Sequence, residues 1–217
     1  MPAMKHQRNL LDYFKHNSHK LGRKKEKKKK GKKERRVSMK PLKRLGRKVV
    51  YEGKILKVCQ DEIETPSGAH VQYDFIMHQG AAAAVPVMED GKIIMVHQYR
   101  NALDRYTLEI PAGGLESKEE PTKLCAMREC EEETGYRPRN AEFLLSIYTT
   151  VAFCNEKIDI YVVDGLVETK QKLDEEEYVE WEAYSVHDLL EKIEKGEIQD
   201  SKSVAAILAY YRKYCIQ

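Results

Sequence analysis

The alternation of apolar and polar residues divides the chain into short strands and a few helices. Apolar positions alternate or run together over residues 49–59 and 70–78, with a turn at 65–68, which predicts a small antiparallel sheet. The next two apolar runs, 81–87 and 92–98, flank Asp90-Gly91, a dipeptide that favours a hairpin. Further strands are predicted at residues 107–110, 142–148, 157–163 and 181–184.

Three segments have the spacing of helices. The central one begins near Pro121, a residue tolerated at a first helical position, and ends at Gly135. A second begins at Ser185, a favourable N-cap, and ends at Gly196. The last covers residues 203–214. Strands around one helix, followed by further helices, predict an α/β sandwich.

Composition limits the class of protein. The chain has 217 residues, 41% hydrophobic and 34% charged, enough for one core with a small appended subdomain. No apolar run approaches the roughly 18–20 residues of a membrane span, and we expect no signal peptide. The cysteines are odd in number, scattered and without a C-x-x-C pair, which predicts reduced thiols in a cytoplasmic protein; they are Cys59, Cys125, Cys130, Cys154 and Cys215.

The net charge of +3 conceals a basic arm on an acidic body. Residues 1–48 hold 20 Lys or Arg against 3 Asp or Glu, and residues 23–36 alone contain 11 basic side chains. Such a block repels itself and buries little surface, so we expect residues 1–45 to be disordered. The arm either contacts nucleic acid non-specifically through residues 20–36 or has no role, since Met39 could itself begin a complete domain.

The central helix carries an unusual set of carboxylates. Glu129, Glu132 and Glu133 stand at positions i, i+3 and i+4, so they share one face. They also lie near the C-terminal end, where the helix dipole is already negative. Folding alone does not require this arrangement. A hard divalent cation such as Mg²⁺ would stabilise it, because such ions take oxygen ligands from carboxylates and substrate phosphates.

The spacing around these residues resembles the signature of the Nudix hydrolases. The fixed positions are a Gly, a Glu six residues later, an Arg-Glu pair, a Glu-Glu pair and a final Gly, matched here by Gly114, Glu120, Arg128, Glu129, Glu132, Glu133 and Gly135. Cys130 stands where the family usually has an aliphatic residue, and a buried Cys serves as a small hydrophobe.

The resemblance implies a Nudix-type α/β/α sandwich and a metal site. Glu129 and Glu133 match the principal metal ligands, Glu132 a supporting ligand, and the carbonyl of Gly113 a further one. The ion would be Mg²⁺, with Mn²⁺ as the alternative. We expect Arg128 to hold Glu120 and a ligand carboxylate in place.

The resemblance extends beyond this motif to the ADP-ribose pyrophosphatase branch. The segments 96–100 and 108–114 resemble it, as do Asn155-Glu156, the acidic run 173–177 and residues 196–200. It implies that Arg100 contacts the diphosphate or terminal ribose and that Glu156 lies on the substrate side. Glu175 or Glu177 would be the catalytic base, with Glu156 and Glu120 as the remaining candidates.

The charge pattern and the extent of the resemblance predict a basic arm at 1–45, a small β subdomain at 46–80 and the hydrolase domain at 81–217. The resemblance also implies a homodimer, in which the sheet at about 49–80 packs against the partner and helps to close its pocket. The predicted reaction splits ADP-ribose or a related nucleoside diphosphate sugar into a nucleoside monophosphate and a sugar phosphate. Val151-Ala152 replace the Pro-Gly usual in this branch, which leaves GDP- and UDP-sugars as alternative substrates. The alternative from another class is a nucleic-acid-binding protein that acts through its arm.

Overall fold

The computed structural model describes residues 40–53, 56–173, 175 and 177–216. The chain divides into two units, residues 1–41 and 42–217, and only Lys40 and Pro41 of the first are described. The predicted nucleic-acid contact at residues 20–36 therefore lies outside the described residues. In the part of the chain that is described, no helix is long and apolar enough to cross a membrane.

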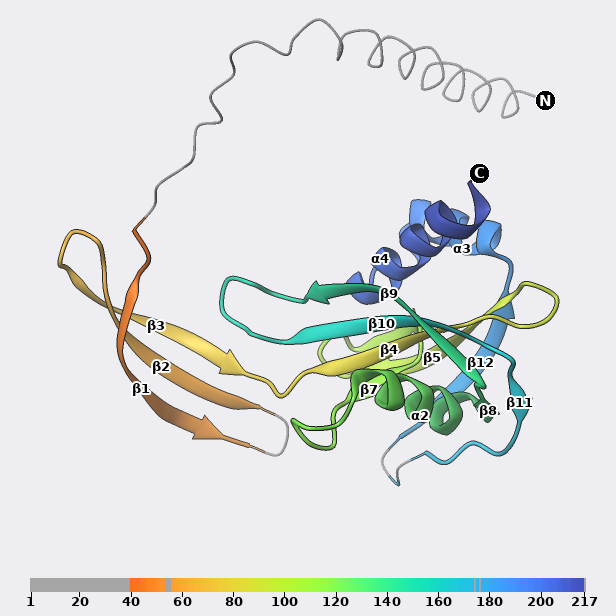
Figure 1. Cartoon of the computed structure of the whole chain (residues 1–217), viewed down its shortest axis with the longest axis horizontal. Helices are drawn as coiled ribbons and strands as arrows, with labels where there is room; N and C mark the ends of the chain where they lie inside the picture. The colour runs from red at the N-terminus through yellow and green to blue at the C-terminus, as the bar shows by residue number, and fades with distance from the viewer. Residues whose placement is uncertain (1–39, 54–55, 174, 176, 217) are drawn as a thin grey trace, which may run out of the picture. The chain divides into compact units, whose positions relative to one another are not determined.

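An antiparallel sheet of three strands begins the second unit, as predicted. Its strands are β1 (Lys43–Glu52), β2 (Lys57–Glu64) and β3 (His70–Met77), in the order β1-β2-β3 (Figure 1). The apolar stretch 49–59 is divided between two strands of this sheet, which its pattern did not indicate. The amide of Gly53 donates to the carbonyl of Leu56 at 2.8 Å, so the chain reverses there. The apolar residues on the two sides of this turn belong to different strands.

β1 begins within the segment predicted as the arm. Its basic residues have acidic partners on β2. Lys43 lies opposite Glu64, and Nε and Nη2 of Arg47 donate to the two carboxylate oxygens of Asp61 at 2.5 and 2.6 Å. All of β1 is exposed, so its pairing leaves no signal in the hydrophobic pattern.

The central sheet has the strand order β7-β4-β10-β9. β4 (Ala81–Pro86) and β10 (Lys157–Asp164) run parallel, while β7 (Ala112–Gly114) and β9 (Asn140–Tyr148) are antiparallel to their neighbours. Successive residues of β4 face opposite layers. Ala83 packs in a core with Ile207 of the C-terminal helices, and Ala84 packs in a core with Cys125 of the central helix. This alternation produces the sandwich.

A third sheet shows that the predicted hairpin is only partly correct. Asp90-Gly91 forms a tight turn, in which the amide of Met88 donates to the carbonyl of Lys92 at 2.9 Å. After a single bridge between Val87 and Ile93, however, the two strands enter different sheets. β5 (Ile93–Arg100) lies between β12 (Val179–Tyr184) and β6 (Arg105–Glu109). The short pair β8 (Tyr136–Arg137) and β11 (Val167–Glu168) was not predicted.

The three predicted helices are all present. α2 (Thr122–Thr134) covers one face of the central sheet, and α3 (Val186–Glu194) and α4 (Ser201–Tyr210) cover the other (Figure 1). α4 begins two residues earlier than predicted, because Asp200 caps it by accepting from the Ser203 amide at 3.0 Å. It continues as a π-helical turn, Tyr211–Cys215. The fold is thus the predicted α/β/α sandwich with a small N-terminal antiparallel sheet.

Candidate active site

The central helix α2 is fixed at both ends and along its buried face. Pro121 precedes it in an extended conformation, and Gly135 ends it in the left-handed region at φ 73°. A Cβ at residue 135 would lie 3.1 Å from the backbone nitrogen of Gln171. Glycine is therefore favoured here both by the backbone angle and by the lack of space for a side chain. Cys125 and Cys130 are fully buried and pack against the central sheet. The predicted site residues of α2 are thereby held beside the edge strand β7.

Two of the helix carboxylates lie directly against β7. The carboxyl group of Glu129 sits over Gly113, where any added Cβ would come within less than 3.0 Å of it. Glu133 is almost fully buried and accepts a hydrogen bond from the amide of Ala112 at 3.2 Å. With any other residue at 113, the end of the Glu129 side chain would have to shift away from β7.

Burial makes these two carboxylates reluctant to ionise. It raises the pKa of Glu129 to about 7, and the negative charges of Glu132 and Glu177 add to the effect, although Arg128 opposes it. Burial likewise raises the pKa of Glu133 to about 8, with Glu129 as the main charged contributor. Two buried like charges at one place are costly without a cation.

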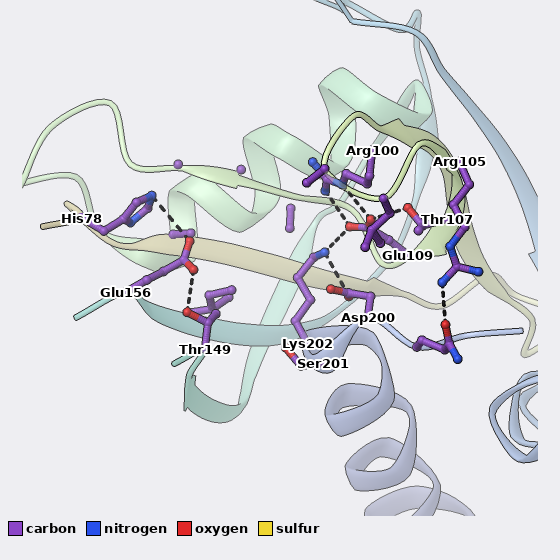
Figure 2. A pocket seen from close by; sticks show the side chains of 18 residues that line it. His78, Arg100, Arg105, Thr107, Glu109, Thr149, Glu156, Asp200, Ser201 and Lys202 are labelled. Atoms are coloured by element: carbon purple, nitrogen blue, oxygen red, sulfur yellow. Dashed lines mark hydrogen bonds and ion pairs between the residues drawn. The ribbon is translucent and has the colours of Figure 1, made fainter. Parts of the chain in front are cut away.

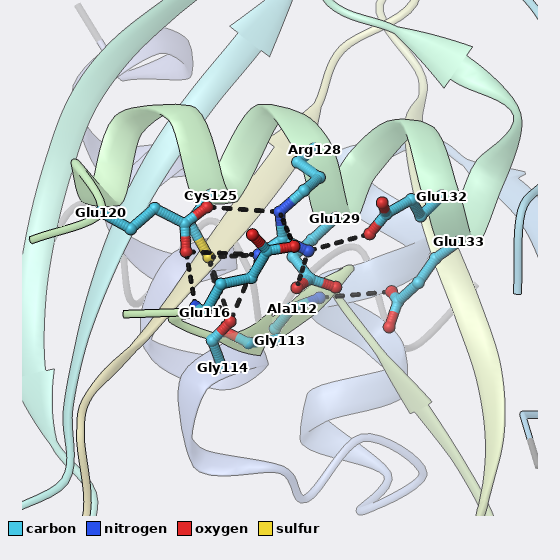
Figure 3. Close-up of polar contacts among 10 residues, drawn as sticks. All are labelled: Ala112, Gly113, Gly114, Glu116, Glu120, Cys125, Arg128, Glu129, Glu132 and Glu133. Atoms are coloured by element: carbon cyan, nitrogen blue, oxygen red, sulfur yellow. Dashed lines mark hydrogen bonds and ion pairs between the residues drawn. The ribbon is translucent and has the colours of Figure 1, made fainter. Parts of the chain in front are cut away.

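Arg128 joins several acidic and polar groups into one network (Figure 3). Its Nη1 donates to Glu129 at 2.7 Å and to Glu132 at 2.9 Å. Its Nε lies 3.3 Å from Glu120, and its Nη2 donates to the carbonyl of Gly114 at 3.3 Å. Glu120 in turn accepts from the Glu116 amide at 2.7 Å. Arg128 therefore ties the loop before α2 to the carboxylate face.

The two candidate bases lie in different surroundings. Glu177 is partly buried, and its charge raises the pKa of both Glu129 and Glu133, which places it near the helix carboxylates. Glu175 is exposed in a turn. The neighbouring residues 174 and 176 of this acidic run lie outside the described residues.

A cavity of about 590 Å³ opens beside β7 (Figure 2). Arg100 and Glu156, predicted to face the substrate, both line it, together with Ala112, Gly113 and Gly114. The strand β7 therefore lines the cavity and also contacts the carboxylate face of α2.

Glu156 is held on both oxygens. Thr149 donates to one at 2.7 Å, and Nε2 of His78 lies 3.5 Å from the other. Nδ1 of His78 accepts from the Gly80 amide at 3.0 Å, so the proton of the neutral ring is on Nε2 and faces Glu156. His78 was not singled out from the sequence, since a lone histidine at a strand end has no distinguishing pattern.

Arg100 pairs with Glu109, a partner that was not predicted from the sequence. Its Nε and Nη2 donate to the two oxygens of Glu109 at 2.7 and 2.6 Å. Lys202, which is buried, contacts the same carboxylate and also Asp200 at 3.0 Å. Glu109 lies in a segment that resembles the branch, but a lysine on the first turn of α4 carries no recognisable spacing to residues 93 positions earlier.

The loop in which Val151-Ala152 replace Pro-Gly contacts the N-terminal sheet. The carbonyl of Phe153 accepts from the amide of Ile76 at 2.7 Å, and Cys154 forms a bridge with the same residue. Val151 itself is 81% exposed. The loop thus joins the end of β3 to the region that leads into Glu156.

The residues beside β7 suit a hard divalent cation by their chemistry. The donors are oxygens only, from the carboxylates of Glu129, Glu132 and Glu133 and the carbonyl of Gly113. Burial and neighbouring negative charges raise the pKa values of Glu129 and Glu133, and a bound cation would offset both effects. Gly113 leaves room for the Glu129 carboxylate where a Cβ would intrude. Within the described residues these side chains do not surround one common point, since Glu129 and Glu132 turn toward Arg128.

A helix of clustered carboxylates beside a cavity lined with charged groups is an arrangement that suits phosphate chemistry assisted by a divalent cation. The Nudix domain family matches residues 77–207. The chain belongs to the Nudix family, which confirms the resemblance found in the sequence, and it is a Nudix hydrolase.

The relatives and solved structures agree with this assignment. An ADP-ribose pyrophosphatase of Bacillus subtilis is 36% identical over 81% of this chain and 95% of its own length. A methanol dehydrogenase activator of Bacillus methanolicus is 38% identical over 73% of this chain and 86% of its own length. A crystal structure of an ADP compounds hydrolase superposes with a TM-score of 0.72 at 19% identity, covering 81% of this chain and 95% of that one, and shows the same fold.

Proposed function

We propose that this enzyme hydrolyses the diphosphate bond of ADP-ribose or a related nucleoside diphosphate sugar, releasing a nucleoside monophosphate and a sugar phosphate. The observation that carries the proposal is the position of β7. Ala112 and Gly113 line the cavity, and on the same strand they contact Glu133 and Glu129. A ligand in the cavity therefore places a diphosphate beside the carboxylate face.

Gly113, Glu129, Glu132 and Glu133 would hold the metal, which we propose is Mg²⁺, with Mn²⁺ as the alternative. When bound, the ion supplies neutralisation of phosphate charge and polarisation of water. Arg128 and Glu120 keep the carboxylates oriented, since Arg128 contacts Glu120, Glu129 and Glu132 together.

Glu177 is the better supported of the two candidate bases. Its charge acts on both Glu129 and Glu133, so water activated by Glu177 would be near the phosphate that these residues serve. Glu175 is exposed in the same loop and remains the alternative.

Arg100 and Glu156 lie on the cavity wall with opposite charges. We propose that Arg100 binds the diphosphate or the terminal ribose. Glu156, oriented by His78 and Thr149, presents acceptor oxygens to hydroxyl groups of the ligand.

The choice of ADP-ribose is supported by the names of relatives in Bacillus subtilis and Mycobacterium tuberculosis, both ADP-ribose pyrophosphatases. A panel of ADP-ribose, GDP-sugar and UDP-sugar substrates, assayed with Mg²⁺ and followed by product identification, tests it. ADP-ribose should give the highest kcat/KM and yield AMP with ribose 5-phosphate. A higher value for another sugar nucleotide would reassign the substrate, and no turnover of any would remove the proposed reaction.

We also propose that the enzyme is a homodimer formed through the N-terminal sheet. All of β1 is exposed, including the apolar residues Leu45, Val49, Val50 and Tyr51, and a second copy would cover this surface. Light scattering of the purified chain measures this, and a monomer at all concentrations would contradict it.

A cytoplasmic location is proposed from the thiols. All five cysteines are free, and three of them are buried in cores. Localisation of the tagged chain in fractionated cells tests this.

A further inference from the structure

Lys202 is a buried cation on the wall of the cavity. Its side chain is 8% exposed, and its Nζ contacts Glu109 and, at 3.0 Å, Asp200 (Figure 2). Burying an ammonium group is costly unless it is paired and hydrogen-bonded. Both of the carboxylates that pair with Lys202 belong to residues that line the cavity.

Arg100 alone already balances the single negative charge of Glu109. The carboxylate is 3% exposed and already has a bidentate partner in Arg100, while Thr107 donates to it at 2.6 Å. Arg100 and Lys202 meet on the same oxygen, Oε2. Two cations therefore share one buried carboxylate.

Sharing weakens the hold of Glu109 on Arg100. A buried carboxylate with one cation holds that cation strongly. When a second cation binds the same oxygen, the two cations repel each other, and the net attraction that holds each of them is smaller. The positive charge of Arg100 then remains available to an anionic ligand in the cavity. The bonds to Glu109 use Nε and Nη2, and Nη1 is the nitrogen that these two bonds do not occupy.

The position of Lys202 is fixed by its helix. Asp200 accepts from both the amide and the hydroxyl of Ser203, at 3.0 and 2.6 Å. The Ser203 hydroxyl accepts in turn from the amide of Ile110 at 2.9 Å. The first turn of α4 is thus tied to the residue that follows Glu109, which fixes the distance between the lysine and the carboxylate.

From these contacts we infer that Lys202 is a positioning residue for substrate binding, which acts through Glu109 to keep Arg100 available for the anionic part of the ligand. The inference rests on the proposed function, because it names a residue that supports the same cavity.

A double-mutant cycle tests this role. Lys202→Met should raise KM for ADP-ribose about tenfold and leave kcat within about threefold, because the lost interaction is binding rather than chemistry. In the Arg100→Ala background the same change should alter KM by less than about twofold, because its effect travels through Arg100. Equal effects in both backgrounds, or an unchanged KM, would overturn the inference.

The controls separate this role from a merely structural one. Lys192→Met removes another lysine that is paired with a glutamate, Glu197 at 2.9 Å, and should leave KM unchanged. If Lys202→Met does not fold, Lys202→Gln replaces it in the cycle with the same expected result, since glutamine keeps a hydrogen-bond donor but not the charge.

Binding of inorganic pyrophosphate, measured by calorimetry in EDTA, gives a readout without turnover. Lys202→Met should weaken it about tenfold in the wild-type background and leave it unchanged in Arg100→Ala. Should the wild type bind pyrophosphate in this way but fail to split ADP-ribose, the proposed function falls while the inference stands. Additive effects on pyrophosphate affinity would overturn the inference alone.

Discussion

The carboxyl group of Glu129 occupies the space into which a side chain at Gly113 would project. A Cβ built on Gly113 would lie closer than 3.0 Å to the carboxyl carbon and to both oxygens. The Glu129 carboxylate can therefore lie against β7 only because residue 113 has no side chain, and any Cβ there would force the end of the Glu129 side chain to move.

Gly113→Ala should lower kcat by at least about tenfold, because the new methyl group displaces the Glu129 carboxylate from its position beside β7. Steady-state kinetics at saturating Mg²⁺, with a thermal unfolding curve, measures this. Gly46→Ala is the control, since an added Cβ there meets nothing within 4 Å. Wild-type turnover in Gly113→Ala would mean that the approach of Glu129 is unimportant.

Glu129→Gln and Glu133→Gln should each lower kcat by about 10²-fold or more, because each change removes a charge that would hold metal beside the developing phosphate charge. The matched control lies on the same helix. Glu131 is bound by Arg137 at 2.8 and 2.9 Å, so Glu131→Gln should retain near wild-type kcat. Near wild-type turnover in Glu129→Gln or Glu133→Gln at saturating Mg²⁺ would remove that residue from the site.

Glu109 should make stability depend on pH in the acid range. Arg100 and Lys202 outweigh the effect of burial and lower the pKa of Glu109 to about 2, from an ordinary value of 4.5. A lowered pKa stabilises the folded protein fully above the unfolded value, and this contribution is lost as the pH falls from about 4.5 through about 2. Its size is on the order of 3 kcal/mol.

Urea unfolding of the wild type and of Glu109→Gln, at several pH values between 7 and 2, checks this. The difference in the free energy of unfolding should be constant near neutrality and shrink below about pH 4.5. A difference that stays constant down to pH 2 would show that the ionised form of Glu109 is not favoured by folding.

Deleting residues 1–40 should leave kcat/KM for ADP-ribose within a few-fold, because that segment is too polar to join the core and β1 begins only at Lys43. The same deletion should abolish any salt-sensitive binding to RNA or DNA, measured by titration at several salt concentrations. Loss of folding or of activity would show that the segment is structural.

What could be predicted from the sequence depended on whether the signal was local. The bounds of α2 followed from Pro121 and Gly135, and the carboxylate face followed from helical spacing. The partner strands of β4 and β5 did not follow, because the Asp90-Gly91 turn specifies a reversal and not which sheet each strand joins. Lys202 could not be recognised as part of the cavity wall, since its place there depends on a contact with Glu109, a residue 93 positions earlier, that only the folded chain creates.

The last prediction separates the base from the metal ligands. If a carboxylate at Glu175 or Glu177 activates water, its removal should lower kcat while the Mg²⁺ dependence stays nearly unchanged, because the group acts only on the nucleophile. Removing Glu129 or Glu133 should change both. From its place near the helix carboxylates, Glu177→Gln should have the larger effect, about 10²-fold or more, and Glu175→Gln a smaller one.

Neighbouring carboxylates can substitute for one another, so the double variant of Glu175 and Glu177 is needed beside the two single changes. Single-turnover rates and Mg²⁺ titrations of all three report the chemical step and metal binding separately. An unchanged chemical step in the double variant would exclude this loop. Glu156 and Glu120 would then be the candidates, and they differ in position: Glu156 lines the cavity, whereas Glu120 is bound by Arg128 and is not among the residues that line it. A base must reach the attacking water, so Glu156→Gln would be the next variant to measure.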